Sequence, residues 1–352
     1  MVSTQKNLGK EGYQKLLGQL KAGSYQRAYA FYGKERYLLE FYRKELRNKL
    51  VSGPAEDFNY HRFTEENFSL EAFSDAINAI PMMSDYSLVE LVDVDVFSQS
   101  TADCKVLAEI FENLPEFCVL LLVYEDATWN PDKLSQKRWA ALQGKLLQVE
   151  FSMQSEQALV PWIKKHLKTG DKTISNDLCR YLISLTGGSM TTLNAELEKL
   201  MCYTEGAEIT REDIDAIVIP VLEAAIYQLT DDILKKDFDG ALQRLQTLLR
   251  QEYEPTAING SIGTQFQQLY AAKLLQEHGG SAFDLTKIYP RVRAWQAKRI
   301  YSQAGSFHKA LLKRAMGICA DTDYAIKTSG GDKEELVQMM ILRLAEACRE
   351  GR

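Results

Sequence analysis

The first 150 residues alternate short apolar runs with amphipathic segments, and this alternation constrains the fold more than any other feature of the sequence. The apolar runs predict strands at 28–32, 58–63, 88–94, 119–124 and 146–151. Several of these runs are continuous, which is typical of parallel strands that are covered by helices on both faces. Strands that alternate with helices predict an α/β domain built on a parallel sheet.

One of the intervening helices is expected to precede Pro81. Its apolar positions share one face at helical spacing, and they are Leu70, Phe73, Ile77 and Ile80. Ser69 stands in front of the first of them, which is a typical position for an N-cap. The pattern therefore predicts a helix that ends at Ile80, with Pro81 as its stop.

The strand signals end after Phe151, and the rest of the chain predicts helices alone. Gly187 and Gly188 indicate a helix end, and Thr210 with Asp213 resembles a capping box. Short helices occupy the region up to about residue 215, and longer amphipathic helices follow it. We therefore expect three domains, α/β plus all-α: 1–151, 152–215 and 216–352.

Charge and cysteine content exclude several classes of protein. The formal net charge is −6, so the chain as a whole carries no positive field that would drive nucleic-acid binding, although a local basic patch remains possible. The 6 cysteines are scattered without a CxxC pair, which favours a reducing compartment over a disulfide scaffold or a zinc site. The apolar runs are too short to span a membrane, and the N-terminus lacks a signal-peptide core. We expect a cytoplasmic protein.

The stretch "YAFYGKERYLLEFYRKELRNKL" at residues 29–50 has the strand, turn and helix of a nucleotide-binding loop. A phosphate loop of the GxxxxGK[ST] type needs several backbone N–H groups around the phosphates, a lysine, and a hydroxyl for magnesium. Here the loop is short, the hydroxyl is missing, and Glu35 would repel phosphate. Lys34 could still contact an anion at the helix N-terminus. The favoured interpretation is a tight strand-to-helix turn.

Acidic residues follow two of the predicted strands. Asp93 and Asp95 lie where a nucleotide-hydrolysing enzyme carries its metal-binding acids, and Glu125 and Asp126 follow another strand. Solvation of strand ends explains the same pattern. The 4 histidines lack metal-ligand spacing, and no serine or cysteine lies in a nucleophile motif. The sequence therefore predicts no catalytic residue, no metal and no cofactor.

Two adjacent methionines, Met82 and Met83, lie between a predicted helix and the next strand. Methionine surfaces adapt to different partners and recur at protein-binding sites, where an exposed apolar pair can dominate the binding energy. The alternative is that both side chains plug the end of the α/β core.

A basic segment at 289–315 interleaves cations with aromatic residues, as surfaces that bind nucleic acids do. Its first cations are Arg291, Arg293, Lys298 and Arg299. They predict a contact with DNA or with another subunit. The alternative is the solvated face of a helix whose aromatic residues belong to the core.

The whole chain resembles the family of delta subunits of the bacterial DNA polymerase III clamp loader. The resemblance rests on five segments in order: "AYAFYGKERYLLE", "AINAIPMMSDYSLVEL", "LTGGSMTTLNAELEKLMCY", "PTAINGSIGTQFQQLYAAKLL" and "DTDYAIKTSGGDKEELVQMMILRL". It implies an AAA+-like domain that has lost ATP binding, a helical lid and a helical collar. It also implies a non-catalytic part of the polymerase III holoenzyme in DNA replication.

The same resemblance implies partners and a binding site. The partners would be the sliding clamp (beta subunit), the gamma/tau motor subunits, delta-prime and primed DNA. The clamp-binding residues would be Ile80, Pro81, Met82 and Met83, and the implied role is to open the clamp ring. The segment Ser189–Thr192 carries no arginine, whereas ATP-hydrolysing relatives carry one there. An ATP-hydrolysing AAA+ subunit, a delta-prime-like stator and an unrelated adaptor remain the alternatives.

Overall fold

The computed structural model describes residues 2–54, 56–125 and 139–350, and the chain divides into two compact units. The first unit comprises Met1–Ser155 with Ser189–Thr191, and the second comprises Glu156–Gly188 with Thr192–Arg352. Each unit has its own core and is described by itself. The finer division of the second unit into a lid and a collar stays a prediction.

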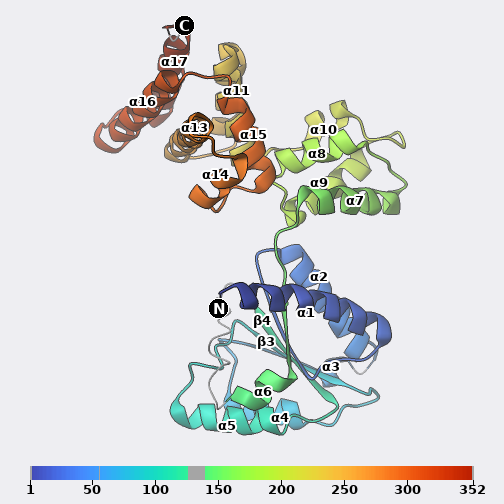
Figure 1. Ribbon diagram of the computed structural model, residues 1–352. Coiled ribbons are helices and arrows are strands. Elements are labelled where there is room, and N and C mark those ends of the chain that lie inside the picture. Colours follow the sequence, from blue (N-terminus) through green and yellow to red (C-terminus); the bar gives the residue numbers. More distant parts are fainter. Residues whose placement is uncertain (1, 55, 126–138, 351–352) are drawn as a thin grey trace. The chain divides into compact units, whose positions relative to one another are not determined.

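A five-stranded sheet forms the centre of the first unit (Figure 1). Its strands are β1 (Ala28–Tyr32), β2 (Tyr60–Thr64), β3 (Ser87–Val92), β4 (Cys118–Tyr124) and β5 (Leu146–Glu150). The order is β2-β3-β4-β1-β5, and all four pairings are parallel. The predicted parallel sheet is thus confirmed, with every strand within a few residues of its expected place.

Helices cover both faces of this sheet, as the continuous apolar strands predict. On one face lie α1 (Val2–Ala22) and α2 (Arg36–Val51), and on the other lie α4 (Leu70–Asn78), α5 (Thr101–Glu112) and α6 (Ala140–Lys145) (Figure 1). The strand period of two separates the side chains of β1: Tyr29 and Phe31 belong to the first face, and Ala30 to the second.

The β5 edge of the sheet is covered by α1, and Gly12 makes this close packing possible. A Cβ atom at Gly12 would lie 1.7 Å from the carbonyl oxygen of Gln148 in β5. A helix can approach a strand backbone this closely only where a residue has no side chain.

The second unit is built of helices, which confirms the predicted all-α region. Its first helices are α7 (Glu156–Leu167), α8 (Asn176–Leu185), α9 (Met190–Tyr203) and α10 (Arg211–Ile217). Gly187 and Gly188 have positive φ of 64° and 71° after α8, so the predicted helix end is correct. The capping box at the start of α10 is also confirmed, because both hydrogen bonds between Thr210 and Asp213 form.

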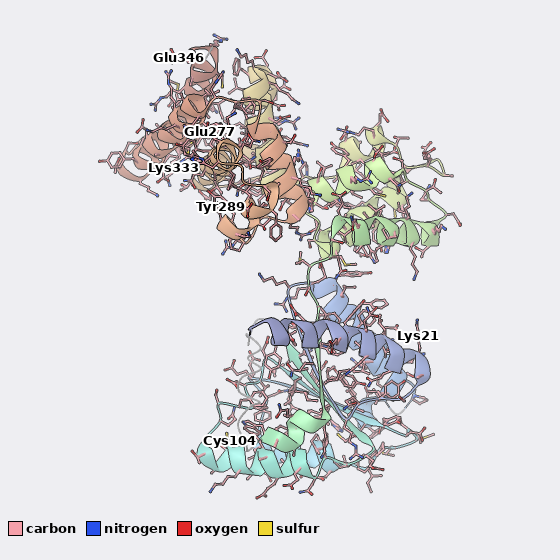
Figure 2. All side chains as sticks on the ribbon, in the orientation of Figure 1. Lys21, Cys104, Glu277, Tyr289, Lys333 and Glu346 are labelled. Atoms are coloured by element: carbon pink, nitrogen blue, oxygen red, sulfur yellow. The ribbon has the colours of Figure 1, made fainter. Side chains whose placement is uncertain are left out.

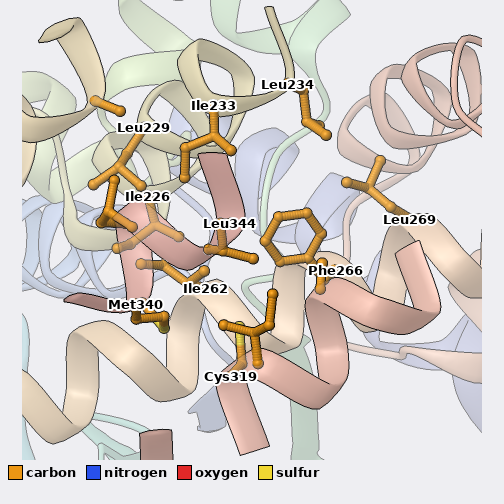
Figure 3. Packing of buried hydrophobic residues seen from close by; sticks show 14 of the residues in the cluster. Ile226, Leu229, Ile233, Leu234, Ile262, Phe266, Leu269, Cys319, Met340 and Leu344 are labelled. Atoms are coloured by element: carbon orange, nitrogen blue, oxygen red, sulfur yellow. The ribbon is translucent and has the colours of Figure 1, made fainter. Parts of the chain in front are cut away.

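The remaining helices share one core. They are α11 (Leu222–Lys235), α12 (Phe238–Arg250), α13 (Pro255–Glu277), α14 (Ala282–Ile288), α15 (Ala294–Ala304), α16 (Lys309–Thr328) and α17 (Lys333–Glu350). Figure 3 shows Ile226 of α11, Phe266 of α13 and Leu344 of α17 packed within this core. Burial of such apolar side chains is the main stabilising term for these helices.

The cysteines behave as small apolar residues. All six are free thiols, and five of them are buried, among them Cys104 on α5 (Figure 2). Burial raises the pKa of Cys118 to about 11 and that of Cys319 to about 12, so both stay protonated at neutral pH. Among the described residues, no helix is long and apolar enough to cross a membrane.

Two glycines of α1 offer a matched test of the packing on β5. We expect Gly12→Ala to lower the free energy of unfolding by about 1–3 kcal/mol, because the added methyl group meets the strand backbone. Gly18→Ala, on the same helix with nothing within 4 Å of the added atom, should raise it by about 0.5–1 kcal/mol. Urea denaturation measures both, and equal effects of the two substitutions would contradict the packing argument.

Candidate protein-binding site

The chain's own backbone fills the turn between β1 and α2. The N–H of Phe151 donates to the carbonyl of Tyr32 (2.8 Å), and the N–H of Glu35 donates to the carbonyl of Phe151 (2.9 Å). Gly33 has φ of 132°, and a Cβ there would lie 2.3 Å from the Phe151 carbonyl oxygen. The loop amide that a phosphate would need is therefore bonded within the protein.

The start of α2 also disfavours an anion. Glu35 precedes the first helical residue, Arg36, and its side chain is buried. A carboxylate at a helix N-terminus occupies the region where the helix dipole would attract a phosphate. Lys34 is exposed. This geometry favours the tight-turn interpretation of the sequence.

Asp93 and Asp95, which follow β3, accept hydrogen bonds from backbone N–H groups. Asp93, which has φ of 55°, accepts the backbone N–H of Glu125 at 2.8 Å, and Asp95 accepts that of Phe97 at 3.1 Å. Asp126 lies outside the described residues. Within the described part of the chain, no three His, Cys, Asp or Glu side chains are placed to hold a metal ion. Asp93 and Asp95 therefore hold backbone groups near the carboxyl ends of β3 and β4.

An ionic network between α2 and β3 replaces apolar packing at one place in the core. Arg43 donates to both carboxylate oxygens of the buried Glu90, at 2.5 and 2.9 Å, and to Glu40 and Glu125, each at 2.8 Å. Tyr60 also donates to Glu90. Burial, together with this bond, raises the pKa of Tyr60 to about 12. For Arg43, burial lowers the pKa, but the bonds to Glu90 and Glu40 outweigh it and raise the pKa overall.

A polar hollow of about 450 Å³ lies beside this network, between α2 and β2. Its cations include Arg43, Lys44, Arg47 and Arg62. Arg47 is already bonded to Glu56, and its guanidinium lies 3.8 Å from the centre of the Tyr60 ring. Acidic residues thus balance much of the positive charge here, and the hollow gives no reason to expect an anion.

The segment between α4 and β3 presents apolar side chains to solvent. The helix ends at Asn78 instead of Ile80, because Ala79 adopts an extended conformation and the residue before Pro81 disfavours the helical region. Ile80 is 80% exposed, Met82 52% and Met83 91%. The expectation that the helix extends to Ile80 is therefore wrong. The alternative that Met82 and Met83 plug the core is also wrong.

Asn59 contacts this segment, which no pattern in the sequence indicates. The predicted strand 58–63 begins only at Tyr60, and Phe58 and Asn59 lie in the short helix α3 (Glu56–Asn59). Phe58 is exposed, whereas Asn59 is buried. The Asn59 side chain accepts the N–H of Met82 and donates to its carbonyl, each at 2.7 Å. We call Ile80–Met83 the apolar loop.

The predicted basic residues near α15 fall into two groups. Arg293 donates to the carbonyl of Gly188 at 2.8 Å, and the guanidinium of Arg299 lies 3.4 Å from the centre of the Tyr227 ring. Arg291 and Lys298 are exposed. The aromatic residues Tyr289 and Tyr301 of the same segment pack against the helical core. The structure thus brings two of the four cations to internal contacts and leaves two at the surface.

These features define a class: an α/β unit with a five-stranded parallel sheet, whose turn between β1 and α2 is filled by the chain's own backbone, followed by a unit built of helices. Comparisons with known proteins give the family. A model described as "DNA polymerase III, delta subunit" matches residues 29–150, and one for the C-terminal domain of that subunit matches residues 223–344. The two models together span more than half of the chain, which therefore belongs to the delta subunit family of DNA polymerase III.

Individual relatives agree with this assignment. DNA polymerase III subunit delta of Bacillus subtilis (strain 168) is 26% identical over 333 residues, which are 92% of this chain and 94% of the relative. A probable subunit delta of Aquifex aeolicus (strain VF5) is 26% identical over 265 residues, 72% of this chain and 73% of that one.

A solved structure supports the fold. The Bacillus subtilis DNA clamp loader delta protein (YqeN) superimposes with a TM-score of 0.61 and 24% identity, covering 94% of this chain and 99% of that one. The predicted combination of a parallel-sheet domain with helical domains is thus confirmed. Family membership also shows that the unrelated-adaptor alternative is wrong.

The Arg43–Glu90 pair gives a stability prediction. Arg43→Met should lower the free energy of unfolding by about 3–5 kcal/mol, because Glu90 would remain buried without its cation. The double substitution Arg43→Met with Glu90→Leu should recover much of that loss. Arg180→Met, which removes exposed ion pairs to Glu156 and Asp177, should change stability by less than about 1 kcal/mol. Chemical denaturation distinguishes these outcomes, and a similar effect of the two single substitutions would refute the network's importance.

The filled β1–α2 turn gives a binding prediction. Isothermal titration with MgATP up to about 1 mM should show no saturable binding, since Glu35 and Phe151 use the loop's backbone groups. Lys34→Ala should leave the titration unchanged. Saturable binding that is lost in Lys34→Ala would restore the alternative of an ATP-hydrolysing subunit.

Proposed function

We propose that this delta subunit binds the sliding clamp through the apolar loop and opens the ring so that it can be loaded onto primed DNA during replication. The observation that carries the proposal is the exposure of Ile80, Met82 and Met83 in the apolar loop, which lies between α4 and β3. Exposed apolar side chains gathered in one short segment mark sites of protein association.

The binding energy of such a loop is sufficient for the role. Burying roughly 100–200 Å² of apolar surface at about 25 cal/mol per Å² contributes a few kcal/mol. Methionine side chains fill irregular pockets well because they are unbranched and flexible. The loop would thus act as an anchor of the type that dominates many protein interfaces.

Opening follows from a difference in affinity and involves no bond chemistry. If the anchor binds the open ring more tightly than the closed ring, binding shifts the population of the clamp toward the open state. ATP would act through the gamma/tau motor subunits, which together with delta-prime would expose or cover the apolar loop. This subunit would then respond to nucleotide bound elsewhere, in keeping with its own filled turn. We assign this role to the cytoplasm.

The alternatives differ in what they need from this chain. A stator of the delta-prime type needs no exposed anchor, and the apolar loop speaks against it. An ATP-hydrolysing subunit needs free backbone amides in the β1–α2 turn, where Glu35 is instead bonded to Phe151. The exposure of Arg291 and Lys298 makes them our candidates for contact with DNA or with a neighbouring subunit.

Removing the anchor tests the proposed function. We expect Met82→Ala combined with Met83→Ala to weaken binding to the sliding clamp by roughly a hundredfold, because the apolar contacts are lost. Isothermal titration calorimetry of the purified subunit against the clamp measures the affinity, and circular dichroism checks the fold.

Met339→Ala is the matched control, since Met339 on α17 is exposed to 49% and resembles Met82 in this respect. It should leave clamp affinity unchanged. Undiminished affinity of the double variant would overturn the anchor proposal, and a clamp that binds neither variant nor parent would favour the stator.

A further inference from the structure

The apolar loop is held by hydrogen bonds to side chains, with little burial of its own. Asn59 is 1% exposed, and its carboxamide is bonded to both polar backbone groups of Met82, 23 residues away in the sequence. The geometry is that of a strand pair, with one acceptor and one donor at 2.7 Å each. A side-chain amide therefore takes the place of a neighbouring backbone.

The residues that follow Met82 show why the two hydrogen bonds with Asn59, which we call the brace, are needed. Met83 has a φ of 52°, a left-handed backbone conformation that residues other than Gly, Asn and Asp adopt rarely. Beyond it, Ser84 donates to the carbonyl of Leu50 at 3.1 Å and accepts the N–H of Tyr86 at 3.3 Å. The loop is thus fixed on both sides of Met83, while the Met83 side chain itself makes almost no contact with the protein.

We propose that Asn59 is a positioning residue for clamp binding, which fixes the backbone of the apolar loop in its binding conformation before the clamp arrives. The inference rests on the proposed function of the loop. Its physical basis is preorganisation, because a segment ordered in advance loses less conformational entropy on association. Asn59 is buried, so it acts through Met82 and would not contact the clamp itself.

The first test removes the brace and keeps the anchor. Asn59→Ala should weaken clamp binding about tenfold, with Met82 and Met83 still present. Hydrogen–deuterium exchange of the free subunit should show faster exchange of the Met82 amide, since its acceptor is gone.

A matched control separates positioning from general stability. Asn259 is also buried, and its side-chain amide donates to the carbonyl of Cys319, 60 residues away in the helical core of the second unit. Asn259→Ala removes the same chemistry far from the loop in the sequence. It should leave clamp affinity and Met82 exchange unchanged, even if it lowers thermal stability as much as Asn59→Ala does.

Asn59→Asp is a second variant, for use if Asn59→Ala does not fold. It tests directly the two hydrogen bonds between residue 59 and the backbone of Met82. In Asn59→Asp, an ionised carboxylate can accept the Met82 N–H but cannot donate to the Met82 carbonyl. A protonated carboxyl group can do both, and burial raises the pKa of such a group. The affinity of Asn59→Asp for the clamp should therefore recover toward that of the parent as the pH falls from 8 to about 5, with the parent protein measured in parallel.

The outcomes separate this inference from the function on which it rests. If Met82→Ala with Met83→Ala abolishes binding while Asn59→Ala and Asn59→Asp bind like the parent, the anchor stands and the positioning role is refuted. If the methionine substitutions leave binding intact, the anchor itself is wrong. Loss of affinity in Asn59→Ala that Asn259→Ala reproduces would show a stability effect and would also overturn the inference.

Discussion

The backbone of Phe151 bonds to both ends of the turn between β1 and α2, and much of the first unit depends on this interaction. The N–H of Phe151 continues the parallel pairing of β1 and β5 by one residue beyond the strands. Its carbonyl accepts a hydrogen bond from the N–H of Glu35. The same contact requires a residue without a side chain at Gly33. A loop fixed in this way keeps the strand–turn–helix geometry of a nucleotide-binding domain while the amide of Glu35 is bonded internally.

The filled turn between β1 and α2 and the proposed anchor in the apolar loop are explained by the same mechanism. In the proposed function, this subunit binds no nucleotide and takes part in an ATP-driven machine through contacts with other proteins, so its role lies in its surfaces. In the first unit the apolar loop is such a surface, and it lies between α4 and the buried strand β3. The rigid sheet beneath it gives the loop a fixed base, as binding loops on α/β scaffolds generally have.

The sequence predicted the sheet well because continuous apolar runs such as Leu120–Val123 can hardly be anything but buried strands. It was less informative where an apolar residue is exposed. Ile80 falls three residues after Ile77, so the helical period assigns it to the core, although Pro81 was a local signal that the helix ends earlier. The predicted strand 58–63 began two residues too early because Phe58 is apolar. A periodic pattern shows which residues are apolar, but it does not show which are buried.

Interactions between distant residues lay beyond any sequence pattern. Glu90 occupies the middle of an apolar run, and nothing near it indicates that Arg43, 47 residues earlier, bonds to both of its oxygens. Asn59 and Met82 are 23 residues apart in the same way. Such pairs are set by the alignment of β2 with β3 and by the packing of α2 on the sheet, and only the folded chain brings them together.

In the apolar loop, polar side chains hold the backbone while the methionine side chains stay exposed. This combination explains how methionines can serve as the proposed anchor. A left-handed residue such as Met83 is disfavoured by about 1–2 kcal/mol, so the loop would relax unless other contacts held it. Hydrogen bonds from Asn59 and Ser84 supply those contacts without covering the side chains that a partner would need. The backbone is thereby ordered in advance, and the freedom that remains to be lost on binding is concentrated in the methionine side chains. Because these side chains are flexible, they can adapt to the shape of a pocket, and a rigid backbone limits the entropy lost when they do.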